Sequence, residues 1–240
     1  MGRKARRSLK YADIKPETQQ EVTQNEIEFK NKIIVKSKSE NQTDVIHSIL
    51  DNDITFIDGV AGSGKTYLAC GMALELLQHK QVSKIIVSRP TIECGASIGF
   101  LPGDFHEKVS WALQPVMLNF SKFVDKHIIK KMMELEIIEI IPVQHMRGLT
   151  FEDTICIVDE CQNLTEEQLK CIVTRIGKNS KIVLTGDGTQ SDLNQYNSGA
   201  FYRFCQKLQG IDGIGVCHLE EIDIVRHPII VKILERLKEV

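Results

Sequence analysis

The sequence predicts an α/β domain in which a mostly parallel β-sheet is flanked by helices. From about residue 41 onward, short β-branched runs alternate with helical stretches, a pattern typical of a parallel sheet covered by helices. A glycine-rich turn over residues 59–66 follows the first of these strands and precedes a helix. The 240 residues fit one substantial domain. We therefore expect a single domain over residues 41–240, behind a basic and polar extension over residues 1–40.

The individual elements follow from hydrophobic periodicity and from the glycines and prolines that interrupt it. Ile54-Thr55-Phe56-Ile57, for example, is a β-branched run bounded by polar residues, and Pro142 closes another such run. The predicted strands are 54–57, 84–88, 137–141, 155–158, 181–185 and 215–219. The predicted helices are 41–50, 65–79, 165–175, 200–208 and 228–238, together with a longer helical region over 105–135.

Composition limits the class of protein. Hydrophobic residues make up 42% and charged residues 26% of the chain, with a net charge of −2, values that are ordinary for a globular protein and exclude disorder throughout. No apolar run approaches the roughly 18 residues of a transmembrane helix, so no membrane partner is expected. The seven cysteines form no CxxC pair, which favours free thiols in a reducing cytoplasm.

Charge is concentrated at the N-terminus. The first ten residues carry five Lys and Arg and no acid, whereas the remainder of the chain is acidic. Such a tail could contact phosphate backbones, or it could be a solvated terminus.

The glycine-rich turn fits the phosphate-loop pattern G-x-x-x-x-G-K-[ST]. Its glycines allow backbone N–H groups to surround phosphate oxygens at the start of a helix. Lys65 should then reach the β- and γ-phosphates of a nucleotide, and Thr66 should bind Mg²⁺. The residues expected to hold the nucleotide are Gly59, Val60, Ala61, Gly62, Ser63, Gly64, Lys65 and Thr66.

Two further motifs follow predicted strands. Asp159 and Glu160 end the strand 155–158, at the sheet edge where α/β proteins bind ligands. Asp159 could hold Mg²⁺ and Glu160 could polarise an attacking water. Gly186-Asp187-Gly188-Thr189-Gln190 follows the strand 181–185. It is either a simple turn or a γ-phosphate sensor with Gln190 as the sensing residue.

In this order the motifs resemble the ATPase motifs of helicase-type, RecA-like P-loop domains. Further stretches make the chain similar to the PhoH-like ATPase family, and the resemblance covers about residues 40–238. These stretches are residues 88–95 (SRPTIECG), 99–104 (GFLPGD), 107–109 (EKV), 146–148 (MRG), 174–177 (TRIG) and 223–228 (DIVRHP). The chain departs from the family pattern at Val60, where Pro is common, and at Ala96 and Ser97, where a Glu and a polar or basic residue are typical.

The resemblance implies a cytoplasmic, Mg²⁺-dependent ATPase with RNA or single-stranded DNA as partner, in a ring-shaped homo-oligomer, expected to be a hexamer. It implies that Gln42 lies on the adenine side, that Lys65, Thr66, Asp159 and Glu160 form the phosphate and metal site, and that Gln190 is the sensor. Arg226 is the arginine near the C-terminus, and Arg226 or Arg175 could act on a neighbouring subunit's nucleotide or be a surface salt-bridge partner. Arg89 and Arg147 lie in motifs that could face nucleic acid or a neighbouring subunit.

Other functions share parts of this pattern. A small-molecule kinase also uses a phosphate loop, but Glu160 beside Asp159 favours activation of water. A GTPase would need a base-reading N-K-x-D motif, and Asn41-Gln42-Thr43-Asp44 has Gln in place of Lys. A regulatory module with slow turnover, using ATP as a conformational ligand, stays open. Helicase activity would need a second RecA-like module, supplied by another subunit.

Overall fold

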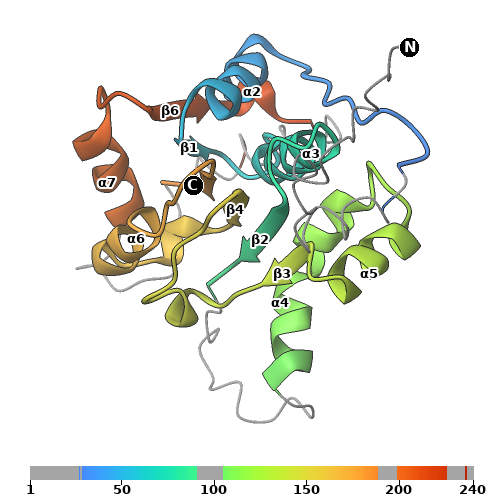
Figure 1. The fold of residues 1–240 in the computed structure, drawn as a ribbon. Helices are drawn as coiled ribbons and strands as arrows, with labels where there is room; N and C mark the ends of the chain where they lie inside the picture. The colour runs from blue at the N-terminus through green and yellow to red at the C-terminus, as the bar shows by residue number, and fades with distance from the viewer. Residues whose placement is uncertain (1–26, 28, 91–104, 189–198, 226–235, 237–240) are drawn as a thin grey trace, which may run out of the picture.

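The core of the molecule is a six-stranded parallel sheet, seen in the computed structural model in Figure 1. The structure describes residues 27, 29–90, 105–188, 199–225 and 236, with side chains described from residue 113 onward in the second long segment. The strand order is β3-β2-β4-β5-β1-β6, and every pairing is parallel. The strands are β1 (Ile54–Gly59), β2 (Lys84–Ser88), β3 (Ile138–Ile140), β4 (Thr154–Val158), β5 (Lys181–Gly186) and β6 (Ile214–Leu219).

Helices cover both faces of this sheet (Figure 1). One face packs against α2 (Glu40–Asp51), α3 (Lys65–Gln78), α4 (Phe105–Phe120) and α5 (Lys126–Glu134). The other face packs against α6 (Glu166–Val173) and α7 (Ala200–Leu208). Successive residues of one strand alternate between the two layers, as Ile155 and Cys156 do in β4. Because both faces are covered, apolar residues predominate in the middle of the strands, which is the pattern that the sequence shows.

The predicted α/β fold is confirmed, with differences at the helices. The predicted helical region over 105–135 is two helices, because the chain turns after Phe120 and Phe123 stacks on Tyr67 of α3 with 4.7 Å between ring centroids. The described part of the chain also contains three 3-10 helices that the sequence pattern did not predict: η1 (Val143–His145), η2 (Cys161–Asn163) and η3 (Glu221–Asp223). Most of the predicted helix 228–238 lies outside the described residues.

The segment before α2 packs on the domain. Ile27 and Ile33 are buried in the same apolar cluster as α3. The Ile33 backbone N–H donates to Gln78 Oε1 at 2.8 Å, and the Val35 N–H donates to Glu75 Oε2 at 3.4 Å. Ile27, Ile33 and Val35, which the sequence assigned to an extension, therefore lie against the core rather than apart from it.

The parallel register brings the chemically important loops to one edge. Asp58 of β1 is level with Gly186 of β5, and Ser88 of β2 is level with Val158 of β4. The residues that directly follow the carboxyl ends of β1, β2, β4 and β5 therefore lie at one edge of the sheet. None of the described helices is long and apolar enough to cross a membrane.

Candidate nucleotide-binding site

The phosphate loop joins β1 to α3 as the sequence predicts. Gly62 and Gly64 have φ of 90° and 93°, in the left-handed region that glycine occupies without a steric penalty. Gly64 is the N-cap of α3, and no side chain caps this helix. The first N–H groups of α3 are thus left to a ligand, and the positive end of the helix dipole faces an anion placed there.

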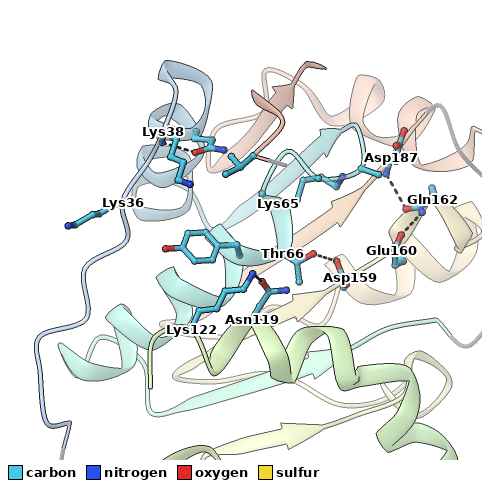
Figure 2. A pocket seen from close by; sticks show the side chains of 16 residues that line it. Lys36, Lys38, Lys65, Thr66, Asn119, Lys122, Asp159, Glu160, Gln162 and Asp187 are labelled. Atoms are coloured by element: carbon cyan, nitrogen blue, oxygen red, sulfur yellow. Dashed lines mark hydrogen bonds between the residues drawn. The ribbon is translucent and has the colours of Figure 1, made fainter. Parts of the chain in front are cut away.

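Lys65 is held by the loop itself. Its Nζ donates to the backbone carbonyls of Gly59 at 2.6 Å and of Val60 at 3.0 Å, and Figure 2 shows the ammonium beneath the loop. Burial lowers the pKa of Lys65, although nearby carboxylates oppose this effect. The carboxylates are those of Asp187, Glu160, Asp159 and Asp58. A partly buried ammonium at a phosphate-sized opening gains a strong partner when an anion enters.

Asp159 connects the loop to the centre of the sheet. Its Oδ1 accepts a hydrogen bond from Thr66 Oγ1 at 2.8 Å and another from Thr185 Oγ1 at 2.5 Å. Asp159 is buried, with 3% of its surface exposed. A hydroxyl and one carboxylate are hard oxygen ligands, which suit Mg²⁺ because this ion keeps several waters and uses few protein ligands. The Thr66–Asp159 pair is therefore a candidate Mg²⁺ position. Among the described residues no group of three or more His, Cys, Asp and Glu could hold a metal.

Glu160 has an unusual backbone conformation. Its φ is 58° and its ψ is 42°, a left-handed conformation that costs a residue with a Cβ about 1–3 kcal/mol. Its Oε1 accepts from Arg89 Nη2 at 3.0 Å, and its Oε2 accepts from Gln162 Nε2 at 2.6 Å. The carboxylate that the sequence assigned to water activation is therefore oriented from both sides.

Gln162 and Asp58 belong to the site although the sequence assigned them no role. Gln162 Oε1 accepts the backbone N–H of Asp187 at 3.1 Å, so its amide links Glu160 to the turn after β5. Asp58 Oδ1 accepts the backbone N–H of Gly188 at 2.7 Å and thereby anchors the same turn to β1. Asp58 directly precedes the phosphate loop and Gln162 lies two residues after Glu160. This closeness to the two motifs is the only feature of the sequence that pointed to them. Gln190, the predicted sensor, lies outside the described residues.

These residues surround one pocket of about 630 Å³, shown in Figure 2. It extends from Glu160 and Asp187 past Lys65 to Lys36 and Lys38 (Figure 2). Its walls include Ala61, Gly62, Gly64, Lys65, Thr66, Tyr67, Asn119, Lys122, Asp159, Gln162 and Val225. A pocket of this size accommodates a nucleotide. Of the other loop residues, Ser63 is buried and its Oγ donates to the Val60 carbonyl at 2.8 Å.

Gln42, which the family resemblance assigned to the adenine side, contacts the phosphate loop. It lines the pocket, and its Nε2 donates to the Ser63 carbonyl at 2.9 Å. Its Oε1 accepts the Lys38 N–H at 2.8 Å. The Val225 N–H donates to the Gly62 carbonyl at 3.1 Å, so the chain after η3 reaches the same loop.

The predicted arginines are spread over the molecule. Arg89 contacts the acid pair, with its Nη1 3.5 Å from Asp159 Oδ2. Arg175 lies at the amino-terminal edge of the sheet, where its backbone carbonyl accepts the Phe151 N–H and its guanidinium donates to the carbonyls of Cys171 and Leu149. It is therefore remote from the phosphate loop of its own chain. Arg147 is exposed, and Arg226 lies outside the described residues.

The comparison with known solved structures supports the fold. The large terminase of a thermophilic bacteriophage is similar with a TM-score of 0.54 at 12% sequence identity, covering 84% of this chain and 50% of that one. The TM-score shows that the two proteins share a fold, and the low sequence identity supports no conclusion beyond the fold. The parallel sheet, its covering helices and the phosphate loop together form a P-loop α/β fold.

Sequence relatives are much more similar. "PhoH-like protein" of Bacillus subtilis (strain 168) is 40% identical over 217 residues, covering 90% of this chain and 67% of the relative. "PhoH-like protein" of Synechocystis sp. is 39% identical over 202 residues, covering 84% and 62%, respectively. "Protein PhoH" of Escherichia coli (strain K12) is 33% identical over 194 residues, covering 80% and 55%. The chain thus spans a little over half to two thirds of the length of these curated relatives.

A family model described as "PhoH-like protein" matches residues 34–238. That range contains the phosphate loop, the acid pair and the sheet that brings them together. The chain belongs to the PhoH-like protein family.

Proposed function

We propose that the protein binds ATP together with Mg²⁺ and hydrolyses it to ADP and phosphate. The observation that carries the proposal is the 2.8 Å hydrogen bond between Thr66 Oγ1 and Asp159 Oδ1. It brings the end of the phosphate loop to the first acidic residue after β4, with Glu160 adjacent. This combination of hydroxyl, carboxylate and second carboxylate serves phosphoryl transfer to water.

Each residue has a role that follows from its position. Lys65 and the loop N–H groups would bind the β- and γ-phosphates, and Thr66 and Asp159 would hold Mg²⁺. The metal would neutralise charge that develops on the transferred phosphoryl group. Glu160 would accept a hydrogen bond from the attacking water and orient it, because its carboxylate lies on the pocket wall and stays 38% exposed.

The proposal is tested by measuring phosphate release with no added acceptor, which separates hydrolysis from a kinase reaction. Lys65→Ala should abolish nucleotide binding or turnover, because the charge that contacts the phosphates is removed. Glu160→Gln should still bind ATP, while its kcat falls by about 10²-fold or more. Normal turnover by Glu160→Gln would contradict the mechanism. Very slow release by the wild type itself would favour the regulatory-module alternative.

We further propose that this ATPase acts on RNA or single-stranded DNA as a homo-oligomer, with a hexameric ring as the expected form. Two features support the proposal. Five of the first ten residues are basic, and apolar side chains are exposed beside the pocket, with Ile222 83% and Val225 42% exposed. In such an assembly a second copy of the chain would cover these apolar side chains.

Hydrolysis with and without single-stranded RNA or DNA, beside a mass measurement of the assembly, tests this part. Binding through phosphates should weaken steeply as salt is raised. A salt-independent interaction, or a monomer at all concentrations with and without ATP, would contradict it.

A further inference from the structure

Arg89 is brought to the acid pair by the register of the sheet. It follows the last residue of β2, and Ser88 of β2 is level with Val158 of β4. The Asp159 N–H donates to the Ser88 carbonyl at 3.0 Å, which continues this pairing beyond the strands. Arg89 therefore stands beside Asp159 and Glu160 because two adjacent parallel strands end together, although 70 residues separate Arg89 from Asp159 in sequence.

The guanidinium of Arg89 spans both carboxylates. Its Nη2 is 3.0 Å from Glu160 Oε1 and its Nη1 is 3.5 Å from Asp159 Oδ2. The remaining carboxylate oxygens have other donors, namely Gln162 on Glu160 Oε2 and two threonine hydroxyls on Asp159 Oδ1. The Arg89 side chain is only 22% exposed, so its charge is poorly placed to contact a large external partner.

Arg89 contacts the acid pair without lining the pocket. Among the described residues that form the pocket wall, Asp159 and Glu160 are present and Arg89 is not. A residue in this position acts on the nucleotide through the carboxylates. Arg89 also adds a cation next to the acid pair, at a site where four carboxylates already act on Lys65. This charge matters because ATP itself is a polyanion.

We propose that Arg89 is a positioning residue for ATP hydrolysis, which aims the Glu160 carboxylate and offsets the negative charge of the acid pair. The inference rests on the proposed ATPase function and differs from the role in nucleic-acid contact that the sequence motif implied. The 3.0 Å contact to Glu160 is the stronger of the two. Because the contact to Asp159 Oδ2 is longer, at 3.5 Å, a bound cation can replace Arg89 at that oxygen. Glu160 keeps its contact with Arg89 meanwhile.

A merely structural ion pair is the alternative, and Lys84 provides the matched control. Lys84 is the first residue of β2, and its Nζ pairs with Glu139 on β3. The two side chains are 25% and 28% exposed, which is close to the 22% of Arg89. Lys84→Ala thus removes a partly buried ion pair from β2 at the opposite end from the site. Both Ala variants should lose comparable thermal stability, and a difference in catalysis would isolate the effect at the site.

The test measures kcat and KM of phosphate release for the wild type, Arg89→Ala, Arg89→Lys and Lys84→Ala. We expect Arg89→Ala to lower kcat about 10–100-fold, with KM changed less than about threefold, because orientation of the base is lost. Arg89→Lys should be intermediate, since one ammonium can hold Glu160 but cannot span two carboxylates as a planar guanidinium does. Lys84→Ala should keep the kcat of the wild type.

A binding measurement adds a readout that does not depend on turnover. The affinity for ATP is measured in excess EDTA and again with Mg²⁺. Arg89→Ala should lose roughly 3–10-fold in EDTA, where no metal ion helps Lys65 to offset the acid pair, and clearly less with Mg²⁺.

Three outcomes would overturn the inference. They are a kcat of Arg89→Ala within twofold of the wild type, a kcat loss equal to that of Lys84→Ala, and an equal loss of ATP affinity in EDTA and in Mg²⁺. The last would mean that Arg89 binds the nucleotide directly. If the wild type releases no phosphate, the proposed function fails. The ATP affinities measured in EDTA and in Mg²⁺ then still test whether Arg89 offsets the charge of the acid pair. If Arg89→Ala does not fold, Arg89→Lys carries the same comparisons.

Discussion

Two residues of the site lower the free energy of unfolding of the protein without a nucleotide. Lys65 is partly buried at the phosphate loop, and Glu160 adopts a left-handed backbone conformation. Both features cost free energy in the folded protein without a nucleotide. Strain and buried charge of this kind are concentrated at functional sites, so these two residues mark the site on physical grounds independent of the motifs.

The lowered pKa of Lys65 predicts a pH-dependent contribution to stability. Above this lowered pKa the folded protein has released the Lys65 proton, whereas the unfolded chain binds it up to about 10.5. In that window the unfolded state binds more protons, so the free energy of unfolding should rise with pH. Below the window the full cost of burying the charge is present. Lys65→Met removes this dependence.

Urea denaturation of both proteins at a series of alkaline pH values measures the effect. The free energy of unfolding of the wild type minus that of Lys65→Met should grow by up to about 1.4 kcal/mol per pH unit across the window. Lys178→Met, at an exposed lysine, is the control and should show no such trend. Parallel curves for the wild type and Lys65→Met would contradict the prediction.

At the scale of elements, the helix after the acid pair has a well-defined start. Thr165 is the N-cap of α6 and forms a capping box with Gln168, each side chain bonding the other residue's backbone N–H. Two acids, Glu166 and Glu167, occupy the first turn, where their negative charge interacts favourably with the helix dipole. With only eight residues, α6 depends on this cap and on packing of Leu169 and Ile172 into the core.

Thr165→Ala should therefore lower the free energy of unfolding by about 1 kcal/mol, within a range of roughly 0.5–2. Chemical denaturation measures the change. Thr174→Ala at the exposed C-cap of the same helix is the comparison, and its loss should be smaller, within about 0.5 kcal/mol. Equal losses for the two variants would show that the capping box contributes nothing specific.

At the scale of the whole molecule, the pocket joins segments that are distant in the sequence. Its walls come from the segment before α2, the phosphate loop, α4, the ends of β4 and β5, and the residues after η3. A ligand that contacts all of them stabilises the folded domain as a unit, because it binds the folded state and not the unfolded chain.

ATP with Mg²⁺ at about 100 times its Kd should add about 2.7 kcal/mol to the free energy of unfolding. For a chain of this size that corresponds to a rise in Tm of roughly 5–10 °C. A thermal melt measures it, with Lys65→Ala as the control that should show almost no rise. A wild-type Tm that does not change when ATP is added would contradict nucleotide binding itself.

Local sequence patterns were sufficient for most of the elements and for the fold class. The β-branched runs, the glycine-rich loop and the acid pair are each contiguous, so period and turn chemistry reveal them. The break between α4 and α5 was missed because it depends on Phe123 packing against Tyr67 of another helix. Burial of Ile27 and Ile33 in the core was missed because it depends on α3. Contacts between elements leave no local pattern.

The sequence by itself determined that this chain is a P-loop α/β protein, with Lys65, Thr66, Asp159 and Glu160 as its central candidates. Their order along the chain and the strands before them were enough, because parallel strands end at a common edge. Only the tertiary structure decided which residues surround that centre. The register of β2 against β4 placed Arg89 on the acid pair, and the side chain of Gln162 reached the turn after β5. Arg175 was placed at the opposite edge of the sheet. Side-chain direction and strand register are set by packing over the whole domain, and no motif encodes them.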